Sequence, residues 1–221
     1  MALPTWRTII TLLEEHHPVV SLPPVRDPLG LVLWEQVAYL AKDDVRAQAF
    51  LELQRLTALD PARILALPLA KLEAVTRSGG SIGWKERAQR IRRTAESAGT
   101  LKDLGKLPLT EARKRLARFD MIGAPGVDKV LLFAGLHPVF ALESNGLRVL
   151  LRLGFGREEA NYSASYRSVM EAIAPLLPKD AVVLAHAHAL LRAHGLTLCK
   201  GNRPLCASCT LQPHCRFGRQ A

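Results

Sequence analysis

Residues 199–215 decide the fold, and they read Cys199-Lys-Gly-Asn-Arg-Pro-Leu-Cys206-Ala-Ser-Cys209-Thr-Leu-Gln-Pro-His-Cys215. All four cysteines of the 221-residue chain lie here, with the spacing C-x6-C-x2-C-x5-C. Cysteines that serve only as small apolar side chains would be scattered along the chain, so the clustering indicates a chemical role. Four thiolates in one compact loop suit a structural zinc ion or a [4Fe–4S] cluster, and the chemistry alone favours neither.

Disulfide bonds are a weaker alternative for these cysteines, because they form in oxidising compartments. The chain starts Met-Ala-Leu-Pro-Thr-Trp, without the charged region, apolar region and cleavage site of a secretory signal. No apolar run approaches the ~18 residues that a membrane-spanning helix needs. We therefore expect a soluble, cytoplasmic protein with reduced thiols, associated with the nucleoid if its source is bacterial.

The composition favours helices and a polyanionic partner. Hydrophobic residues make up 48% of the chain but aromatic residues only 5%, and Ala and Leu dominate the apolar set. This composition favours helices packed on helices, in one large domain or two small ones. The net charge of +10 points to nucleic acid or to an anionic membrane surface. A basic surface that merely keeps the protein soluble is the alternative.

The cysteine spacing resembles the C-terminal cluster loop of endonuclease III, a DNA base-excision glycosylase. His194, Gly195 and Cys199 are similar to that family's His-Gly-x-x-x-Cys approach to the cluster. The resemblance implies a [4Fe–4S] cluster with the four cysteines as ligands. It also implies an all-α, bilobal helix-hairpin-helix glycosylase fold. A six-helix barrel is then expected over residues 26–136, and an iron–sulfur cluster domain over residues 1–25 and 137–221.

Residues 119–133 have the helix-turn-helix layout of the hairpin that gives this fold its name. Such hairpins bind the DNA backbone without reading sequence, through N–H groups of the turn and of the second helix's N-terminus. The resemblance assigns this role to Ile122, Gly123 and Gly126. The family turn reads hydrophobic-Pro-Gly-Val-Gly, whereas here Asp120 replaces the proline and Met121 replaces the first glycine.

The catalytic positions depart from the family pattern. Residues 137–149 are similar to the family stretch Val-Asp-Thr-His-x-x-Arg-Val, whose aspartate supports loss of the base. A gap-free count puts Glu143 at this aspartate and Arg148 at the arginine, which is expected to contact DNA. The same count puts Pro125 at the nucleophilic lysine of bifunctional relatives, and proline has no amine to form a Schiff base. Lys129, one helical turn later, is the candidate substitute.

Three further residues are expected to contact double-stranded DNA that contains damaged or abasic nucleotides. Gln36 matches a family glutamine that enters the DNA and fills the gap left by a flipped base; the alternative is a surface glutamine. Lys200 and Arg203 are expected to bind phosphates from within the cysteine loop. The cluster then has a structural role, because it holds a basic loop in place. We expect a monomer that does not bind membranes.

Three functions compete. The first is a base-excision N-glycosylase for damaged bases, oxidised pyrimidines by resemblance, with a weak or absent AP-lyase step. Glu143 keeps the charge of the family aspartate but displaces it by ~1 Å, which can cost about 100-fold in rate. The second, motivated by Pro125 and Glu143, is a non-catalytic relative that binds damaged or abasic DNA. The third is a redox sensor or electron carrier, which the positive charge and the hairpin disfavour.

Overall fold

The computed structural model describes residues 3–120 and 122–220, and within them the secondary structure is helical, without strands. The expected all-α class is confirmed. The chain forms two compact units, which we call the central unit (residues 23–137) and the terminal unit (residues 1–22 and 138–221). The boundaries expected from the sequence differ from these by at most three residues. Met121, expected in the hairpin turn, lies outside the described residues.

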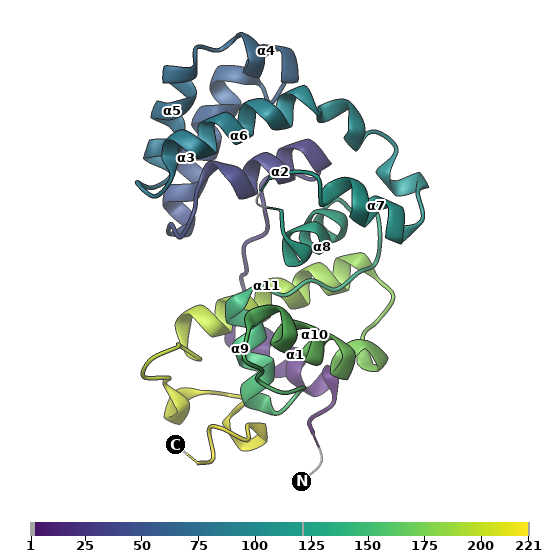
Figure 1. Ribbon diagram of the computed structural model, residues 1–221. Coiled ribbons are helices and arrows are strands. Elements are labelled where there is room, and N and C mark those ends of the chain that lie inside the picture. Colours follow the sequence, from purple (N-terminus) through teal and green to yellow (C-terminus); the bar gives the residue numbers. More distant parts are fainter. Residues whose placement is uncertain (1–2, 121, 221) are drawn as a thin grey trace. The chain divides into compact units, whose positions relative to one another are not determined.

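Helices account for most of the central unit. They are α2 (Pro28–Val37), α3 (Asp43–Thr57), α4 (Pro61–Ala66), α5 (Leu69–Ser78), α6 (Trp84–Glu96), α7 (Leu109–Leu116) and α8 (Ala124–Phe133), as Figure 1 shows. Asp27 and Asp60 cap α2 and α4, each followed by a proline at the first helical position. Pro68 separates the short α4 from α5, which gives one helix more than the six expected.

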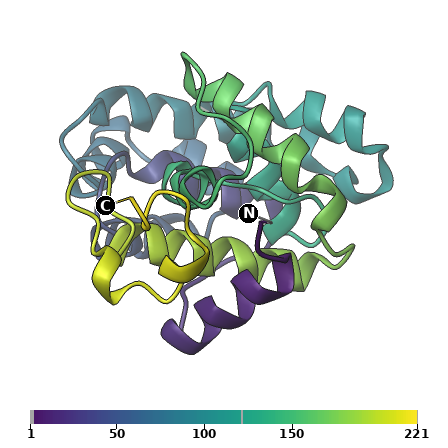
Figure 2. The ribbon, with the colours of Figure 1, turned by 90° about the horizontal axis from the view of Figure 1, so that it is seen from below.

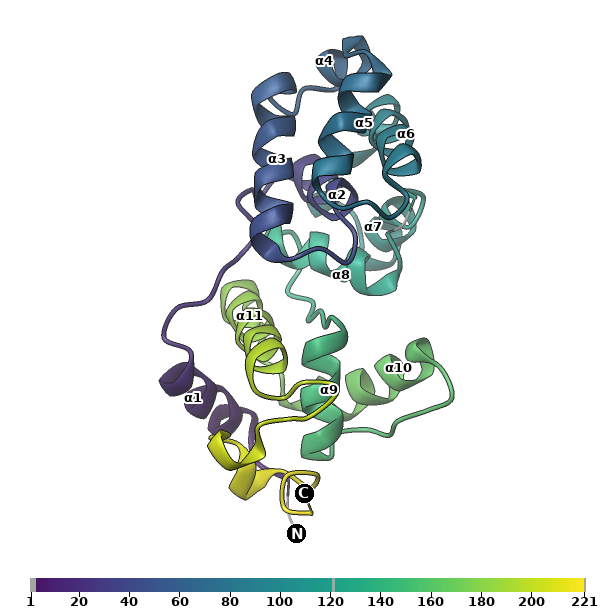
Figure 3. The same ribbon diagram turned by 90° about the vertical axis from the view of Figure 1, so that its left-hand side faces the viewer.

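The core of the central unit lies between α2, α3, α4, α5 and α6. Its fully buried side chains include Leu33, Phe50, Ile64, Leu72 and Ile91. Burying each such side chain stabilises the fold by about 1.5–3 kcal/mol. α5 packs against both α6 and α3, and Figure 3 shows α3 and α5 side by side. This core supports the two loops at residues 38–42 and 79–83.

The terminal unit joins the start of the chain to its last 84 residues. Its helices are α1 (Trp6–His16), α9 (Ser144–Leu153), α10 (Tyr162–Ile173) and α11 (Ala181–Thr197). α11 packs against α9 and also contacts α1, which lies alongside it in Figure 2. Ile9 and Leu13 of α1 are fully buried. α1 is therefore part of the core that supports the cysteine loop.

No helix in the described part of the chain is long and apolar enough to span a membrane.

Candidate functional site

The four cysteines surround one pocket of the terminal unit. Apolar side chains complete much of its lining, among them Leu198, Pro204, Leu205 and Phe217. Two short 3-10 turns, η4 (Cys206–Ser208) and η5 (Gln212–His214), fold the loop back on itself. All four cysteines are free; Cys215 is buried and the other three are half-buried. The loop thus brings the predicted ligands to a common site.

The surroundings of two of the thiols, Cys209 and Cys215, favour their protonated form when no cation is present. Burial raises the pKa of the Cys209 and Cys215 thiols, and the neighbouring cysteines raise both further. Thiolates here therefore need a positively charged partner. Within residues 3–120 and 122–220, no three His, Cys, Asp or Glu side chains are arranged to hold a single metal ion. Four cysteines around one pocket do fit, in kind and number, a larger group with four sulfur ligands.

Arg152 of α9 crosses the cysteine loop, a contact that sequence reasoning missed. Its guanidinium donates to the Lys200 carbonyl at 2.7 Å and to the Cys199 Sγ at 3.4 Å, and stacks 4.4 Å above the Phe217 ring. One sequence feature could have indicated this contact: Arg152 follows Arg148 by one helical turn and therefore lies on the same face of the helix. A fixed cation beside Cys199 stabilises negative charge on that sulfur.

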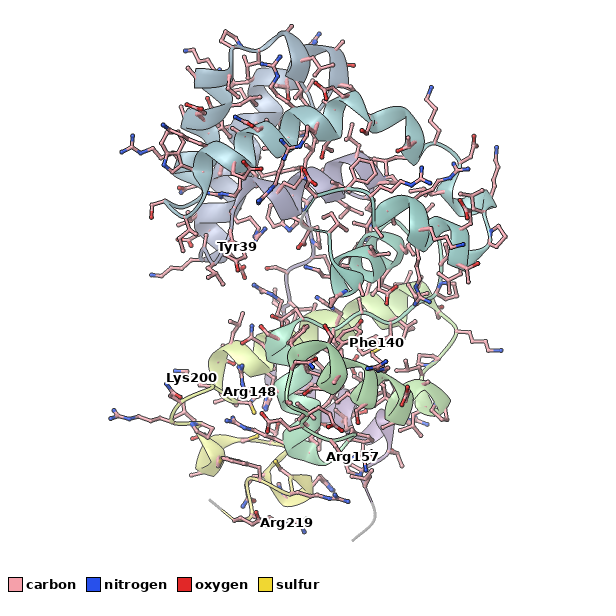
Figure 4. All side chains as sticks on the ribbon, viewed as in Figure 1. Tyr39, Phe140, Arg148, Arg157, Lys200 and Arg219 are labelled. Atoms are coloured by element: carbon pink, nitrogen blue, oxygen red, sulfur yellow. The ribbon has the colours of Figure 1, made fainter. Side chains whose placement is uncertain are left out.

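Arg148 supports the start of the cysteine loop, and its expected contact with DNA stays a prediction. Its guanidinium donates to the carbonyls of Cys199 and Gly195, both at 2.8 Å, and to Asn145 Oδ1. These carbonyls lie at the end of α11 and at the first cysteine. Arg148 therefore holds α9 against the start of the cysteine loop. Figure 4 labels Arg148 on α9 and Lys200 on the neighbouring loop.

Lys200 and Arg203 are exposed on the cysteine loop. Arg203 adopts a left-handed backbone conformation with φ of 54°, which turns the chain sharply between the first two cysteines. The geometry leaves both side chains available for phosphate contacts, which remain a prediction.

Glu143 is the N-cap of α9. One carboxylate oxygen accepts the Gly146 N–H at 2.7 Å and the other accepts the Asn145 amide at 2.7 Å. The positive end of the helix dipole stabilises a carboxylate at this place. Tyr162, at the start of α10, interacts electrostatically with this carboxylate. Burial is the larger cause and the charge of Glu143 the smaller one, and together they raise the pKa of Tyr162 to about 12. Nothing in the sequence connected Tyr162 to Glu143, because the two residues are 19 positions apart.

The hairpin of the central unit consists of α7, a short turn and α8. Gly123 is the exposed N-cap of α8, and Gly126 lies in the first turn, half-buried. Pro125 between them has no N–H, so the helix start offers fewer donors than the family pattern. The side chain of Ile122 is buried, and its N–H donates to the Phe119 carbonyl at 3.2 Å. Ile122 therefore does not present its N–H to a phosphate, contrary to expectation.

Lys129 forms a short ion pair within the central unit. Its ammonium lies 2.6 Å from Glu35 Oε2, and both side chains are largely shielded from water. A Schiff-base nucleophile must be a free, unprotonated amine. The amine of Lys129 is engaged by Glu35, so this geometry does not support Lys129 as a substitute nucleophile. The neighbouring Asp128 pairs with Arg113 at 2.8 Å and ties α7 to α8.

Gln36 lies inside the central unit and is only 2% exposed. Its amide nitrogen donates to the Asp120 carbonyl at 3.2 Å, and its amide oxygen accepts the Thr94 hydroxyl at 2.9 Å. Arg93 of α6 pairs with the Asp120 carboxylate at 2.7 Å. Gln36 thus fastens α2 and α6 to the hairpin turn. Its expected entry into DNA is not supported, because insertion would break both bonds.

Exposed apolar side chains instead gather on the two neighbouring loops, 38–42 and 79–83. Tyr39, Leu40 and Ile82 are 43%, 77% and 54% exposed. The buried guanidinium of Arg87 joins the loops by donating to the carbonyls of Val37, Gly79 and Gly80. Figure 4 labels Tyr39 on the first loop. The loop tips are therefore apolar while their backbones are held from below.

Comparisons with known proteins agree with the arrangement of helices. No family model matches the chain. The sequence is 28% identical over 131 residues to an endonuclease III from Sulfolobus acidocaldarius, a match that spans 59% of this chain and little more than half, 56%, of that relative. The fold is similar to that of endonuclease III in a trapped covalent DNA intermediate, with 23% identity and a TM-score of 0.76.

Two further solved structures have the same fold. One is endonuclease III in a non-covalent DNA complex, with 23% identity and a TM-score of 0.77; the other is a thermostable thymine-DNA glycosylase, with 18% identity and a TM-score of 0.77. All three structural matches cover 97% of this chain and 95% of the other. The chain therefore has the endonuclease III helix-hairpin-helix glycosylase fold, as its sequence predicts.

Proposed function

We propose that this chain is an endonuclease III-like N-glycosylase of base excision repair that lacks the AP-lyase step. The observation that carries the proposal is the Glu143 carboxylate, held at the start of α9 in a chain with a DNA glycosylase fold. By the gap-free count, Glu143 falls at the position of the carboxylate on which the endonuclease III family relies. Its two hydrogen bonds fix its orientation before substrate binds, which electrostatic catalysis requires.

The chemistry assigned to Glu143 is support for cleavage of the bond between sugar C1′ and the damaged base. As the bond breaks, its electron pair leaves with the base and positive charge develops on the sugar. The negative carboxylate stabilises that charge. A water molecule then forms the new bond at C1′, and its proton passes to the carboxylate or to the departing base. The products are a free base and an abasic site.

The lyase step is absent from this proposal because neither lysine position supplies a nucleophile. Pro125 has no amine, and Lys129 is held by Glu35. Strand cleavage through a Schiff base therefore does not follow base release.

DNA binding is assigned to exposed basic and apolar groups. Lys200 and Arg203 bind phosphates, and the exposed Gly123 at the start of α8 offers a further backbone contact. We assign insertion into the DNA duplex to Leu40 and Ile82 instead of Gln36, because exposed apolar side chains at loop tips can separate stacked bases. The protein acts as a monomer, and its substrate is double-stranded DNA with a damaged base. Oxidised pyrimidines are the first class of damaged base to test.

A [4Fe–4S] cluster is the group that we assign to the four cysteines. When bound, it would supply the positive iron centres that stabilise four thiolates, two of which, Cys209 and Cys215, lie where burial opposes their charge. Arg152 and the Gly218 N–H, 3.3 Å from Cys215 Sγ, would offset negative charge on the sulfurs. The cluster's role is structural: it holds the loop that carries Lys200 and Arg203.

The test uses purified protein with its metal content measured. Duplexes containing thymine glycol, a uracil mismatch or an abasic site are incubated with it and divided into samples with and without alkali, and with borohydride. We expect strand breaks only after alkali and no borohydride-trapped complex. Trapping that disappears in Lys129→Ala would contradict the missing lyase step. Tight binding without product from any lesion would contradict catalysis.

The second candidate function is binding of damaged or abasic DNA without catalysis. It is favoured by one observation: both carboxylate oxygens of Glu143 are already engaged within α9. Such a carboxylate has less capacity to receive a proton from water. The assay separates the two functions, because the binder retains affinity for the lesion and releases no base.

A further inference from the structure

A chain of two hydrogen bonds joins α1 to the cysteine pocket within the terminal unit. His17, the C-cap residue of α1, has its Nε2 3.3 Å from Nδ1 of His194 on α11. The other nitrogen of the same ring, His194 Nε2, lies 3.3 Å from Cys209 Sγ. His194 is 1% exposed, whereas His17 is half-buried. The imidazole of His194 therefore stands between the N-terminal helix and one predicted ligand.

Ligation of Cys209 determines the direction of both hydrogen bonds. A ligating cysteine is a thiolate, which has no proton to donate and can only accept. His194 must then donate its Nε2–H to the sulfur. A neutral imidazole has a single N–H, so His194 Nδ1 becomes an acceptor and His17 must donate its Nε2–H to it.

A second contact supports α1 as part of this environment. The hydroxyl of Thr210, directly after Cys209, donates to the Leu12 carbonyl of α1 at 3.4 Å. α1 thus reaches the surroundings of Cys209 by two routes, directly through the Leu12 carbonyl and indirectly through His194 of α11. Because the His194 ring is removed from water, no solvent molecule can easily replace a lost partner there.

We propose that His17 is a positioning residue that holds His194 as a donor to the Cys209 thiolate, so that α1 controls the stability and reduction potential of the cluster. The inference rests on the cluster assigned under the proposed function. A hydrogen bond to a ligand sulfur withdraws electron density and raises the potential of an iron–sulfur centre. Residues that orient metal ligands in this manner typically contribute about 10–100-fold to metal affinity.

The test compares cluster-loaded full-length variants without DNA. His17→Phe keeps a ring but removes the donor, and His17→Gln keeps an N–H donor. His16→Phe is the matched control, since His16 is exposed, its ring lies against those of His17 and His194, and it takes no part in the two hydrogen bonds. His194→Leu removes the whole connection. The measurements are the rate of iron transfer to a chelator and the reduction potential of the cluster.

We expect His194→Leu to lose iron about tenfold faster and to have a lower potential than the wild type. His17→Phe should change both quantities in the same direction by less, while His17→Gln and His16→Phe stay close to the wild type. Equal behaviour of His17→Phe and the wild type, or an equal effect in His16→Phe, overturns the inference. If His194→Leu does not fold, the His17 series decides alone. A wild-type protein without bound iron overturns both the inference and the cluster assignment, whereas a stable cluster indifferent to His17 overturns the inference alone.

Discussion

Glu143 is both a structural cap and the carboxylate to which we assign catalysis. As a cap it resembles any helix-starting acidic residue, and the sequence alone offers no means to separate the two roles. The structure adds Tyr162, whose hydroxyl lies within electrostatic reach of the same carboxylate. That proximity can be measured without DNA.

Tyr162 should titrate late in the folded protein. Its pKa is raised from 10.0 to about 12 by burial and by Glu143. Because the folded pKa exceeds the unfolded one, this tyrosine contributes its full stability below pH 10, and the contribution is lost as the pH rises toward about 12. Ultraviolet titration of wild type and Tyr162→Phe isolates the late phenol. Glu143→Gln should lower the pKa of Tyr162; an unchanged value would mean that the two side chains do not interact.

At the scale of elements, the family resemblance predicted the presence of the hairpin but not the contacts that hold its turn. A hairpin of two helices is present, but its first helix, α7 (Leu109–Leu116), ends before residue 119, so that within residues 119–133 only α8 (Ala124–Phe133) is helical. The burial and hydrogen bonds of Gln36 were not predictable in this way, because its partners, Thr94 and the Asp120 carbonyl, come from distant segments. From sequence alone, a polar residue within an apolar helix can equally be exposed to solvent or be buried and hydrogen-bonded.

Gln36→Leu should destabilise the central unit while leaving exposed loop tips intact. Removing the amide leaves the Thr94 hydroxyl and the Asp120 carbonyl without this partner, which costs about 1–3 kcal/mol. Denaturant unfolding measures the loss. Gln54→Leu, on an exposed position of α3, is the control and should change stability by at most about 0.5 kcal/mol. A variant that loses DNA affinity but no stability would restore the insertion role of Gln36.

Pro125→Lys tests whether the second residue of α8 lies close enough to the sugar of the DNA substrate to act as the family's nucleophile does. The substitution adds an amine and a backbone N–H at the place where bifunctional relatives carry the nucleophile. Borohydride should then trap a covalent complex on a substrate that the wild type processes without trapping. Pro125→Met, of similar length without an amine, is the control. Failure of the lysine variant to trap DNA would place this position away from the sugar.

At the scale of the whole molecule, the division expected from the sequence and the two compact units differ by at most three residues at each boundary. Apolar spacing and proline positions indicate the helices, and the cysteine spacing indicates the fold class. The supporting contacts of Arg148, Arg152 and His194 were not predicted, since each joins segments that only the folded terminal unit brings together. Sequence therefore indicated which four cysteines line the pocket and missed most of the side chains that contact their loop.

Removal of iron should affect the two units unequally. The four cysteines belong to the terminal unit, whereas the core of α2–α6 contains none of them. After mild oxidation and chelation, backbone amides of α9 and α11 should exchange with solvent faster, and those of α3 and α5 should keep their protection. Hydrogen exchange resolved by mass spectrometry measures both. Equal loss of protection in both units would contradict a cluster role confined to the terminal unit.

The most direct test of the glycosylase assignment is release of free base from a lesion-containing duplex, measured with wild type and with Glu143→Gln. The glutamine keeps most of the size and removes the negative charge. We predict base release by the wild type without strand cleavage, and a loss of about 100- to 1,000-fold in the variant while its affinity for the duplex is retained. Equal rates of release by the two proteins, or no release by either from any lesion, would contradict the assignment.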